Sequence, residues 1–347
     1  MTKQRKAVAL ISGGLDSLLA VKLIQEQGIY VEGINFFTGF CVEGHTHAIR
    51  DNGKAKPKRN NALWAAEQLG IKLHIIDVID EYKDVLINPK HGYGTNMNPC
   101  LDCKIFMINK AKIWMVENEF DFIITGEVIG QRPMSQTKYK MPIIAKQSGA
   151  DDLLVRPMCA KNLPATLPER EGWINRELLG DVTGRSRKPQ FEMADKFGFE
   201  DFAQPAGGCC FLTDKFYSAK LVDLWQAHGH KEYELDDIML LKVGRHIRPA
   251  PHFKIIISRE EGEGRFLQGY KKEFISVDSS SHKGPLTLID GTPTSEDLEL
   301  VARIVARYGQ GRTAETVTVT LTEKTGEKRD LTVQPFDDDA QLAAWQV

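Results

Sequence analysis

The sequence predicts an α/β protein with a doubly wound parallel sheet and a smaller C-terminal α+β domain. In the first half of the 347 residues, apolar runs of strand length alternate with helical segments, which is typical of parallel sheets covered by helices. A pair of glycines separates the first apolar run from the first helix. From about Asp236 the pattern changes to strands accompanied by one long helix, which indicates a separate domain. We expect three parts, at residues 1–175, 176–235 and 236–347.

The elements of the first part follow from short apolar runs and from helical periodicity. Strands are expected at residues 6–11, 31–37, 73–78, 122–126 and 154–157, with helices after residue 15 and at 61–69 and 104–118. Gly70 is the usual kind of residue to end the helix at 61–69. Parallel strands end at one edge of their sheet, where ligands bind. Ser12, Phe37, Asp77 and Gly126 should therefore lie close together.

The rest of the chain is expected to be mixed. Short helices should pass through Met193 to Phe197 and through Leu221 to Trp225, after a proline-rich connector. The last part should contain strands at 253–257, 286–289 and 317–321 and a helix at 296–308, whose apolar residues recur on one side. The acidic run at residues 337–339 is assigned no function.

The composition is that of an ordinary globular protein, with 42% hydrophobic and 27% charged residues. A net charge of −2 argues against indiscriminate binding of nucleic acid, although a local basic face remains compatible with RNA recognition. No apolar run approaches the roughly 20 residues that span a bilayer, and no signal peptide is evident. We therefore expect a cytoplasmic protein with no membrane partner.

The first strand runs into a short motif, Ser12-Gly13-Gly14-Leu15-Asp16-Ser17. Backbone amides in such a turn, at the positive end of a helix, suit a phosphate or pyrophosphate. No Gly-Lys-Ser/Thr follows, so the motif is not a Walker A loop. Asp16 is a candidate ligand of Mg²⁺, and Ser12 and Ser17 are candidate donors to pyrophosphate. The alternative is that all three only cap the turn.

Six cysteines occur in a chain that we expect in a reducing compartment, where structural disulfides are rare. Cys100 and Cys103 form a C-x-x-C pair at a predicted helix start, where the helix end and Lys104 should lower thiol pKa values. The hypothesis is that Cys100, Cys103 and Cys209 hold a [4Fe-4S] cluster with one iron open to sulfide. Cys210 could replace Cys209. A persulfide with a resolving thiol, a zinc site and ordinary buried thiols are the alternatives.

These motifs together resemble those of the PP-loop ATP pyrophosphatases, and in particular the tRNA thiouridine synthases. The resemblance rests on the Ser12–Ser17 loop, Asn98-Pro99-Cys100, Thr125-Gly126-Glu127 and the Cys-Phe-Leu that ends at Leu212, and it covers roughly residues 5–215. It implies that the loop binds ATP with Mg²⁺ and that Phe37 and Gly126 contribute to that site. The N-terminal RNA-capture region and the rhodanese-like domain of the 4-thiouridine enzymes are expected to be absent, which makes free sulfide a plausible donor.

The last part resembles the RNA-binding module of the NFACT proteins, through Lys242 to Arg248 and the strand at Phe253. Arg245, His246 and Arg248 are candidate phosphate contacts, and the alternative is a charged strand edge. Arg187, Lys188 and the basic loop from Arg50 to Arg59 could extend an RNA track.

The predicted function is ATP-dependent thiolation of a tRNA uridine. The expected catalytic residues are Cys100, Cys103, Cys209 and Asp16. The expected partners are tRNA and a sulfur donor, either free sulfide or a persulfide carrier, in a possible homodimer. Two alternatives remain: a sulfur transferase or amide ligase acting on a small molecule, and a non-enzymatic RNA-binding protein with a regulatory nucleotide site.

Overall fold

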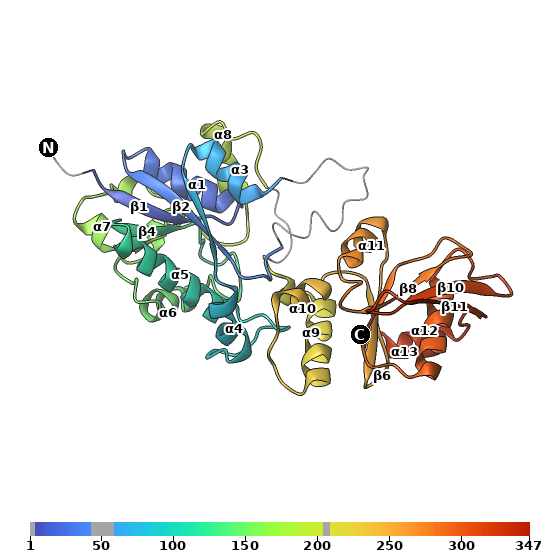
Figure 1. Cartoon of the computed structure of the whole chain (residues 1–347). Coiled ribbons are helices and arrows are strands. Elements are labelled where there is room, and N and C mark those ends of the chain that lie inside the picture. Colours follow the sequence, from blue (N-terminus) through green and yellow to red (C-terminus); the bar gives the residue numbers. More distant parts are fainter. Residues whose placement is uncertain (1–3, 43–58, 204–208) are drawn as a thin grey trace. The chain divides into compact units, whose positions relative to one another are not determined.

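The computed structural model describes residues 4–42, 59–203 and 209–347 (Figure 1). The described residues form two compact units, of which the first ends at Thr213 and the second begins at Asp214. The segment 176–235, expected as a connector, is thus divided between the two units. The basic residues Arg50 to Lys58 lie outside the described residues.

The first unit contains a parallel sheet of five strands in the order β3-β2-β1-β4-β5. The strands are β1 (Lys6–Leu10), β2 (Tyr30–Phe37), β3 (Leu73–Asp77), β4 (Phe122–Thr125) and β5 (Leu154–Val155). The order reverses direction at β1, the position at which doubly wound sheets bind their ligands. The predicted fold class is confirmed.

Helices cover both faces of this sheet (Figure 1). They are α1 (Leu15–Gln25), α3 (Asn61–Leu69), α4 (Ile79–Ile87), α5 (Cys100–Glu117), α6 (Lys140–Gln147), α7 (Leu167–Arg170) and α8 (Lys188–Lys196), with single 3₁₀ turns at Ala160–Asn162, Arg176–Leu178 and Phe211–Thr213. Helices α1, α3 and α8 pack on one face of β1, and α5 and α6 pack on the other. Packing in these two apolar layers, one on each face of the sheet, sets the position of each helix relative to the strand ends.

One boundary differs from the prediction in a way that matters for the site. Helix α5 begins at Cys100 and not at Lys104, because Pro99 precedes its first residue and Cys103 N–H already bonds to Pro99 O at 2.8 Å. Cys100 and Cys103 are therefore in the first turn of the helix, three residues apart and on one side of it.

The second unit contains an antiparallel sheet of six strands in the order β11-β10-β8-β9-β7-β6. The strands are β6 (Arg245–Ala250), β7 (Phe253–Ile257), β8 (Ile275–Ser279), β9 (Thr287–Gly291), β10 (Val317–Thr322) and β11 (Lys328–Val333). The helices are α9 (Lys215–His228), α10 (Leu235–Leu240), α11 (Glu261–Gln268), α12 (Ser295–Tyr308) and α13 (Asp339–Trp345). The apolar side of α12 packs on one face of the sheet, and α10 and α11 pack on the other. No helix among the described residues of either unit is long and apolar enough to cross a membrane.

The second unit buries a charged group inside its sheet. The ammonium of Lys254 on β7 is almost fully buried and lies 3.4 Å from Asp223 Oδ2 and 3.7 Å from Asp290 Oδ2. Arg248 donates a second hydrogen bond to Asp223, at 2.8 Å. A lysine in such a position is tolerated only when carboxylates compensate for the lost hydration.

Asp223→Asn should therefore destabilise this unit by about 2 kcal/mol at pH 7, somewhat less than for a fully buried pair. Burial raises the pKa of Asp223, but Arg248 and Lys254 outweigh it and hold the pKa below its usual range. The ionised carboxylate thus stabilises the fold above the ordinary aspartate pKa, and that contribution is lost as the pH falls through the lower folded value. Hydrogen exchange of the β7 amides in both proteins measures the difference, which should shrink in acid.

Asp339→Asn is the control for this prediction. It removes an exposed partner of Arg307 and should cost less than about 1 kcal/mol. An Asp223→Asn protein as stable as the wild type would contradict this account.

Candidate active site

The loop between β1 and α1 has the geometry of an anion-binding turn. Gly13 has a φ of +77°, and a Cβ there would lie 2.7 Å from the backbone of Asn61 and Ala62, so only glycine fits. Gly14 precedes the helix, and no side chain caps that helix end within the described residues. Ser17 Oγ donates to Gly14 O at 2.8 Å and lies 3.5 Å from Ser12 Oγ. The first amides of α1 and two hydroxyls are thus gathered at one turn.

The end of β4 packs directly on this turn. A Cβ at Gly126 would lie 2.5 Å from the backbone C of Asp16 and from the backbone N of Ser17. The close approach is possible because β4 neighbours β1 in the sheet and glycine carries no side chain. The structure thus brings the predicted nucleotide residues Ser12 to Ser17 together with Gly126. Phe37 lies half-buried at the end of the neighbouring strand β2.

Asp16 is already engaged by protein groups. Its carboxylate accepts hydrogen bonds from Gln131 Nε2 at 2.8 Å and from Gln190 Nε2 at 3.2 Å, and Arg187 lies 3.4 Å away. These contacts hold the Asp16 carboxylate in place at the loop, and its magnesium role stays a prediction. Arg187, predicted as an RNA contact, instead pairs with the loop.

Two buried polar atoms beside Asp16 lack partners. Arg187 Nε and Gln190 Oε1 have no hydrogen bond to any described residue. A buried donor left in this state is costly unless water or a ligand satisfies it. An unsatisfied guanidinium N–H next to an uncapped helix end favours binding of an anion at this loop.

Five of the six cysteine thiols lie at the same edge of the sheet as the loop, in another part of it. Asn98 Nδ2 donates to Cys100 Sγ at 3.2 Å, and Tyr82 hydrogen-bonds Cys103. Cys41 and Cys210 face each other in a short antiparallel bridge. Cys209 is exposed and acts electrostatically on Cys100, Cys103 and Cys210. Cys100 and Cys103 of the predicted set thus both feel the charge of Cys209, whereas the sixth cysteine, Cys159, is buried with its Sγ 3.2 Å from Glu127 O.

The pKa values of the buried thiols are raised and not lowered. Burial raises the pKa of Cys103 to about 12, and that of Cys210 well above its usual range. Burial also raises the pKa of Cys100, although Asn98, Arg132 and Lys104 act in the opposite direction. The predicted lowering by the helix end and Lys104 is therefore wrong, because desolvation outweighs both.

The thiols do not form a ready metal site. Within the ranges that the structure describes, no group of three or more histidine, cysteine, aspartate or glutamate side chains has the arrangement of one. The residues in this conformation do not fit an iron–sulfur cluster.

Two consecutive residues connect the loop with the thiols. Gln131 hydrogen-bonds Asp16, and the charge of Arg132 acts on Cys100. The segment is held by Gly130 N–H to Gln136 O at 2.6 Å and Gln136 N–H to Arg132 O at 2.9 Å. Gln131 and Arg132 thus lie between the Ser12–Ser17 loop and the surroundings of Cys100. The role of Gln190 in it was missed, since nothing in the sequence places α8 against the loop.

Comparisons with known proteins agree with this division of the chain. Residues 5–151 match the model of the tRNA methyl transferase HUP domain, and residues 244–346 match that of the NFACT protein RNA binding domain. The tRNA-specific 2-thiouridylase MnmA of Mesoplasma florum is 28% identical over 159 residues, which are 43% of this chain and 42% of the relative. This chain is similar to the PP-loop tRNA thiouridylases, and its residues 244–346, called the NFACT-type module below, are similar to the NFACT protein RNA binding domain.

Further relatives show the same likeness. The 2-thiouridylase MnmA of Rickettsia rickettsii is 25% identical over 232 residues, covering 62% of this chain and 57% of the relative. A crystal structure of a 4-thiouridine synthetase–RNA complex with bound ATP matches 69% of this chain and 52% of its own, at 20% identity and a TM-score of 0.40. The chain thus spans about half the length of these thiouridylases and of this solved relative. The predicted resemblance is confirmed.

In the NFACT-type module the predicted RNA contacts have different surroundings. His246 is buried, its Nε2 lies 3.0 Å from Val243 O, and burial lowers its pKa well below the usual range. It is therefore a neutral structural residue, and its predicted contact with RNA phosphate is corrected. Arg248 pairs with Asp223, whereas Arg245 lies over the ring of Tyr308 with 5.1 Å between the guanidinium carbon and the ring centroid. Lys188, in the first unit, has an exposed side chain.

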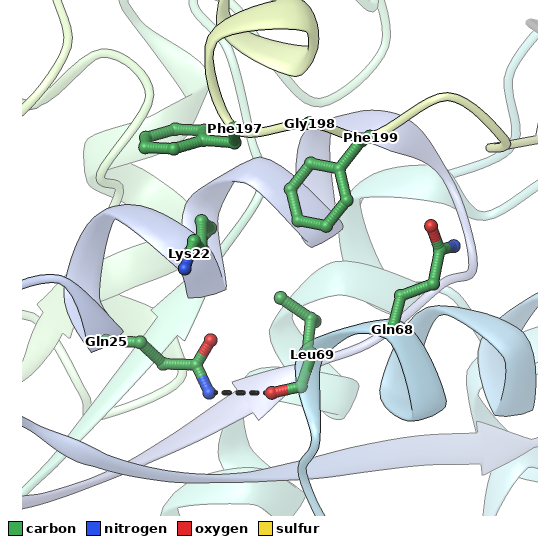
Figure 2. A pocket seen from close by; sticks show the side chains of 7 residues that line it. All are labelled: Lys22, Gln25, Gln68, Leu69, Phe197, Gly198 and Phe199. Carbon is green, nitrogen blue, oxygen red and sulfur yellow. Dashed lines mark hydrogen bonds between the residues drawn. The ribbon is translucent and has the colours of Figure 1, made fainter.

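The first unit of this thiouridylase-like chain also has a hollow of about 300 Å³ beside α1 (Figure 2). Figure 2 shows Lys22 and Gln25 of α1 facing Phe197 and Phe199, with Gln25 Nε2 bonded to Leu69 O at 3.0 Å. These residues belong to the C-terminal half of α1 and to the end of α3. The hollow is thus separate from the loop at the other end of α1 and contains none of the predicted nucleotide-binding residues.

Proposed function

We propose that this chain is an ATP-dependent enzyme that thiolates a uridine of tRNA. The observation that carries the proposal is the adjacency of Gln131, which binds Asp16 of the nucleotide loop, and Arg132, whose charge acts on Cys100. Activation of an oxygen and delivery of sulfur to the same carbon need the two groups in one site. The likeness to tRNA-specific 2-thiouridylases supports tRNA as the substrate.

In the first step, the uridine carbonyl oxygen attacks the α-phosphorus of ATP. The bond from that phosphorus to the bridging oxygen breaks, and pyrophosphate leaves. The amides of the Ser12–Ser17 turn and the unsatisfied Arg187 guanidinium can stabilise the departing charge. The step is needed because a carbonyl oxygen is a poor leaving group, whereas AMP is a good one.

In the second step, sulfur attacks the activated carbon and AMP leaves with the original oxygen. If the sulfur is free sulfide, loss of its proton leaves the thiocarbonyl directly. If it is a persulfide on one cysteine, a second thiol must then attack that cysteine, which releases the thiolated base and leaves a disulfide. An external thiol would reduce this disulfide. Cys209 is suited to accept sulfur because it is exposed, and Cys100 and Cys103, which feel its charge, are the candidate resolving thiols.

The test is mass spectrometry of tRNA nucleosides from cells that lack the protein, together with reactions of the purified protein, ATP and tRNA with either sulfide or a persulfide carrier as the sulfur donor. We expect one thiolated nucleoside to disappear from the cells and to form in the reaction with one AMP per sulfur. AMP formation stimulated by a small metabolite and not by tRNA would point to a small-molecule enzyme instead. Binding of tRNA without any release of pyrophosphate would contradict an enzymatic role.

The form of the sulfur carrier is decided by a separate measurement. The predicted [4Fe-4S] cluster requires iron and acid-labile sulfide in protein purified without oxygen, in about four equivalents each. The persulfide route requires neither, and instead predicts sulfane sulfur that cyanide can remove. Because the thiols do not form a metal site in the described residues, we favour the persulfide or free-sulfide route.

A further inference from the structure

The NFACT-type module has a basic hollow that contains Arg245, one of the predicted RNA contacts, together with arginines that were not predicted to bind RNA. It has a volume of about 320 Å³, in the range of small ligand sites. Its lining consists of Arg245, Arg307, Tyr308, Gly309, Arg312, Asp339 and Leu342. Three guanidinium groups thus meet where β6 begins, α12 ends and α13 lies, elements of the C-terminal unit that are labelled in Figure 1.

Positive charge exceeds negative charge around this basic hollow. Arg307 pairs with Asp339 at 2.7 Å, and Arg303 lies 4.0 Å from Asp337, while Asp338 caps α13. Arg245 and Arg312 have no carboxylate partner among the described ion pairs. The surplus is about two positive charges. The negative C-terminal end of α12 offsets part of the charge of Arg307.

The arginines are held in different ways that suit binding of an anion. The guanidinium of Arg245 rests on the ring of Tyr308, which orients it at little entropic cost. Arg307 is tied to Asp339, whereas Arg312 is exposed at the rim. Planar guanidinium groups at a concave surface favour phosphate, which they can bind in a bidentate manner.

We propose that this basic hollow binds a backbone phosphate of RNA and thereby holds the tRNA for the first unit. The inference rests on the proposed function, because tRNA is its substrate there. RNA is favoured over a free nucleotide because the hollow lies within residues 244–346, which match an RNA-binding domain, and because Arg312 at its rim is exposed. Phosphate contacts of this kind position an RNA without reading its sequence.

The experiment measures the affinity of the full chain for a fluorescein-labelled, unmodified tRNA transcript by anisotropy, at several salt concentrations. Arg312→Ala should weaken binding by about 5-fold and lower the slope of log Kd against log salt by about 1, as expected for one lost phosphate contact. Arg312→Lys should retain most of the affinity, because lysine also binds phosphate. Arg245→Ala combined with Arg312→Ala should weaken binding by about 20-fold or more.

Arg329→Ala is the matched control, since Arg329 is an exposed arginine of the same unit on β11, outside the hollow. It should change Kd by less than about 2-fold. Thiolation assays separate the two proposals: Arg312→Ala should raise KM for tRNA and leave kcat unchanged. If Arg312→Ala and wild type bind tRNA with equal Kd and the protein thiolates tRNA, phosphate binding at the hollow is refuted and the proposed function stands. If the wild type binds tRNA through Arg312 but forms no thiolated base, the proposed function is refuted and phosphate binding at the hollow stands. Binding of AMP at the hollow without any effect on tRNA would also refute the inference.

Discussion

Cys209→Ala should abolish thiouridine formation and leave tRNA-dependent AMP formation largely intact. Cys209 is the exposed thiol of the group and acts electrostatically on Cys100, Cys103 and Cys210, so its sulfur is the most accessible to a donor. Removal of a covalent sulfur carrier should lower the thiolation rate by on the order of 1000-fold. The adenylation step uses the loop at Ser12 to Ser17 and does not need this thiol. Quantifying AMP and thiolated nucleoside in the same reaction mixture measures both rates.

Cys159→Ala provides the control for this experiment. Cys159 is a fully buried thiol whose Sγ hydrogen-bonds Glu127 O, and it does not belong to the group around Cys209. Its replacement should leave both products unchanged at a cost of about 1 kcal/mol in stability. If Cys209→Ala still thiolates and Cys210→Ala does not, the carrier is Cys210. If neither change has an effect, sulfur reaches the base without a protein carrier at this turn.

The nucleotide loop could be foreseen because its determinants are local. A strand-length apolar run, two glycines and an amphipathic helix already predict an anion turn, and the structure confirms the turn through the positive φ of Gly13. The helix at Asn61–Leu69 and the strand at Phe253–Ile257 were predicted at their observed bounds, since each has a strong periodic or apolar signal and a clear end.

The remaining features depend on contacts between distant segments. Strand β8 was missed because Ser276 and Asp278 interrupt its apolar pattern, and it forms only because β9 and β10 pair with it. The sequence does not indicate that Lys254 is buried or that Asp223 and Asp290 compensate for its burial. Arg187 looked like part of a basic surface run, but the start of α8 places it against Asp16. The surroundings of a charged side chain are set by tertiary structure, and composition does not reveal them.

The thiols illustrate the same limit for chemistry. The spacing of Cys100 and Cys103 correctly placed both thiols at the start of one helix, but the pKa argument from the helix end neglected burial. Depth below the surface is a property of the whole fold, and desolvation can shift a thiol pKa by several units, more than one helix terminus can. The segment Phe40–Cys41, which faces Cys210, could not have been assigned to the site from sequence, since only the bridge between them brings it there.

Gly126→Ala should remove the ATP-dependent step while the protein remains folded. The added Cβ would lie 2.5 Å from the backbone of Asp16 and Ser17, a distance that no side-chain rotation can relieve. The first turn of α1 must therefore move, which displaces the amides and the hydroxyl of Ser17 that we assign to pyrophosphate. A displacement of about 1 Å at such a site can cost on the order of 100-fold in rate. Pyrophosphate release in the presence of tRNA measures the loss, and thermal unfolding shows how much of the fold is retained.

Gly264→Ala is the matched substitution, because Gly264 is a helical glycine whose added Cβ would meet nothing closer than 3.7 Å, at Ser258 Oγ. It should leave pyrophosphate release unchanged and stabilise α11 slightly, by up to about 1 kcal/mol. The two glycine variants differ in the crowding that the methyl group meets and in the unit that carries it. Loss of activity in Gly126→Ala alone, with unfolding temperatures close to the wild type in both, would support an ATP site at the junction of β4 and α1. Normal pyrophosphate release from Gly126→Ala would place the nucleotide elsewhere, and the assignment of Ser12 to Ser17 would fail with it.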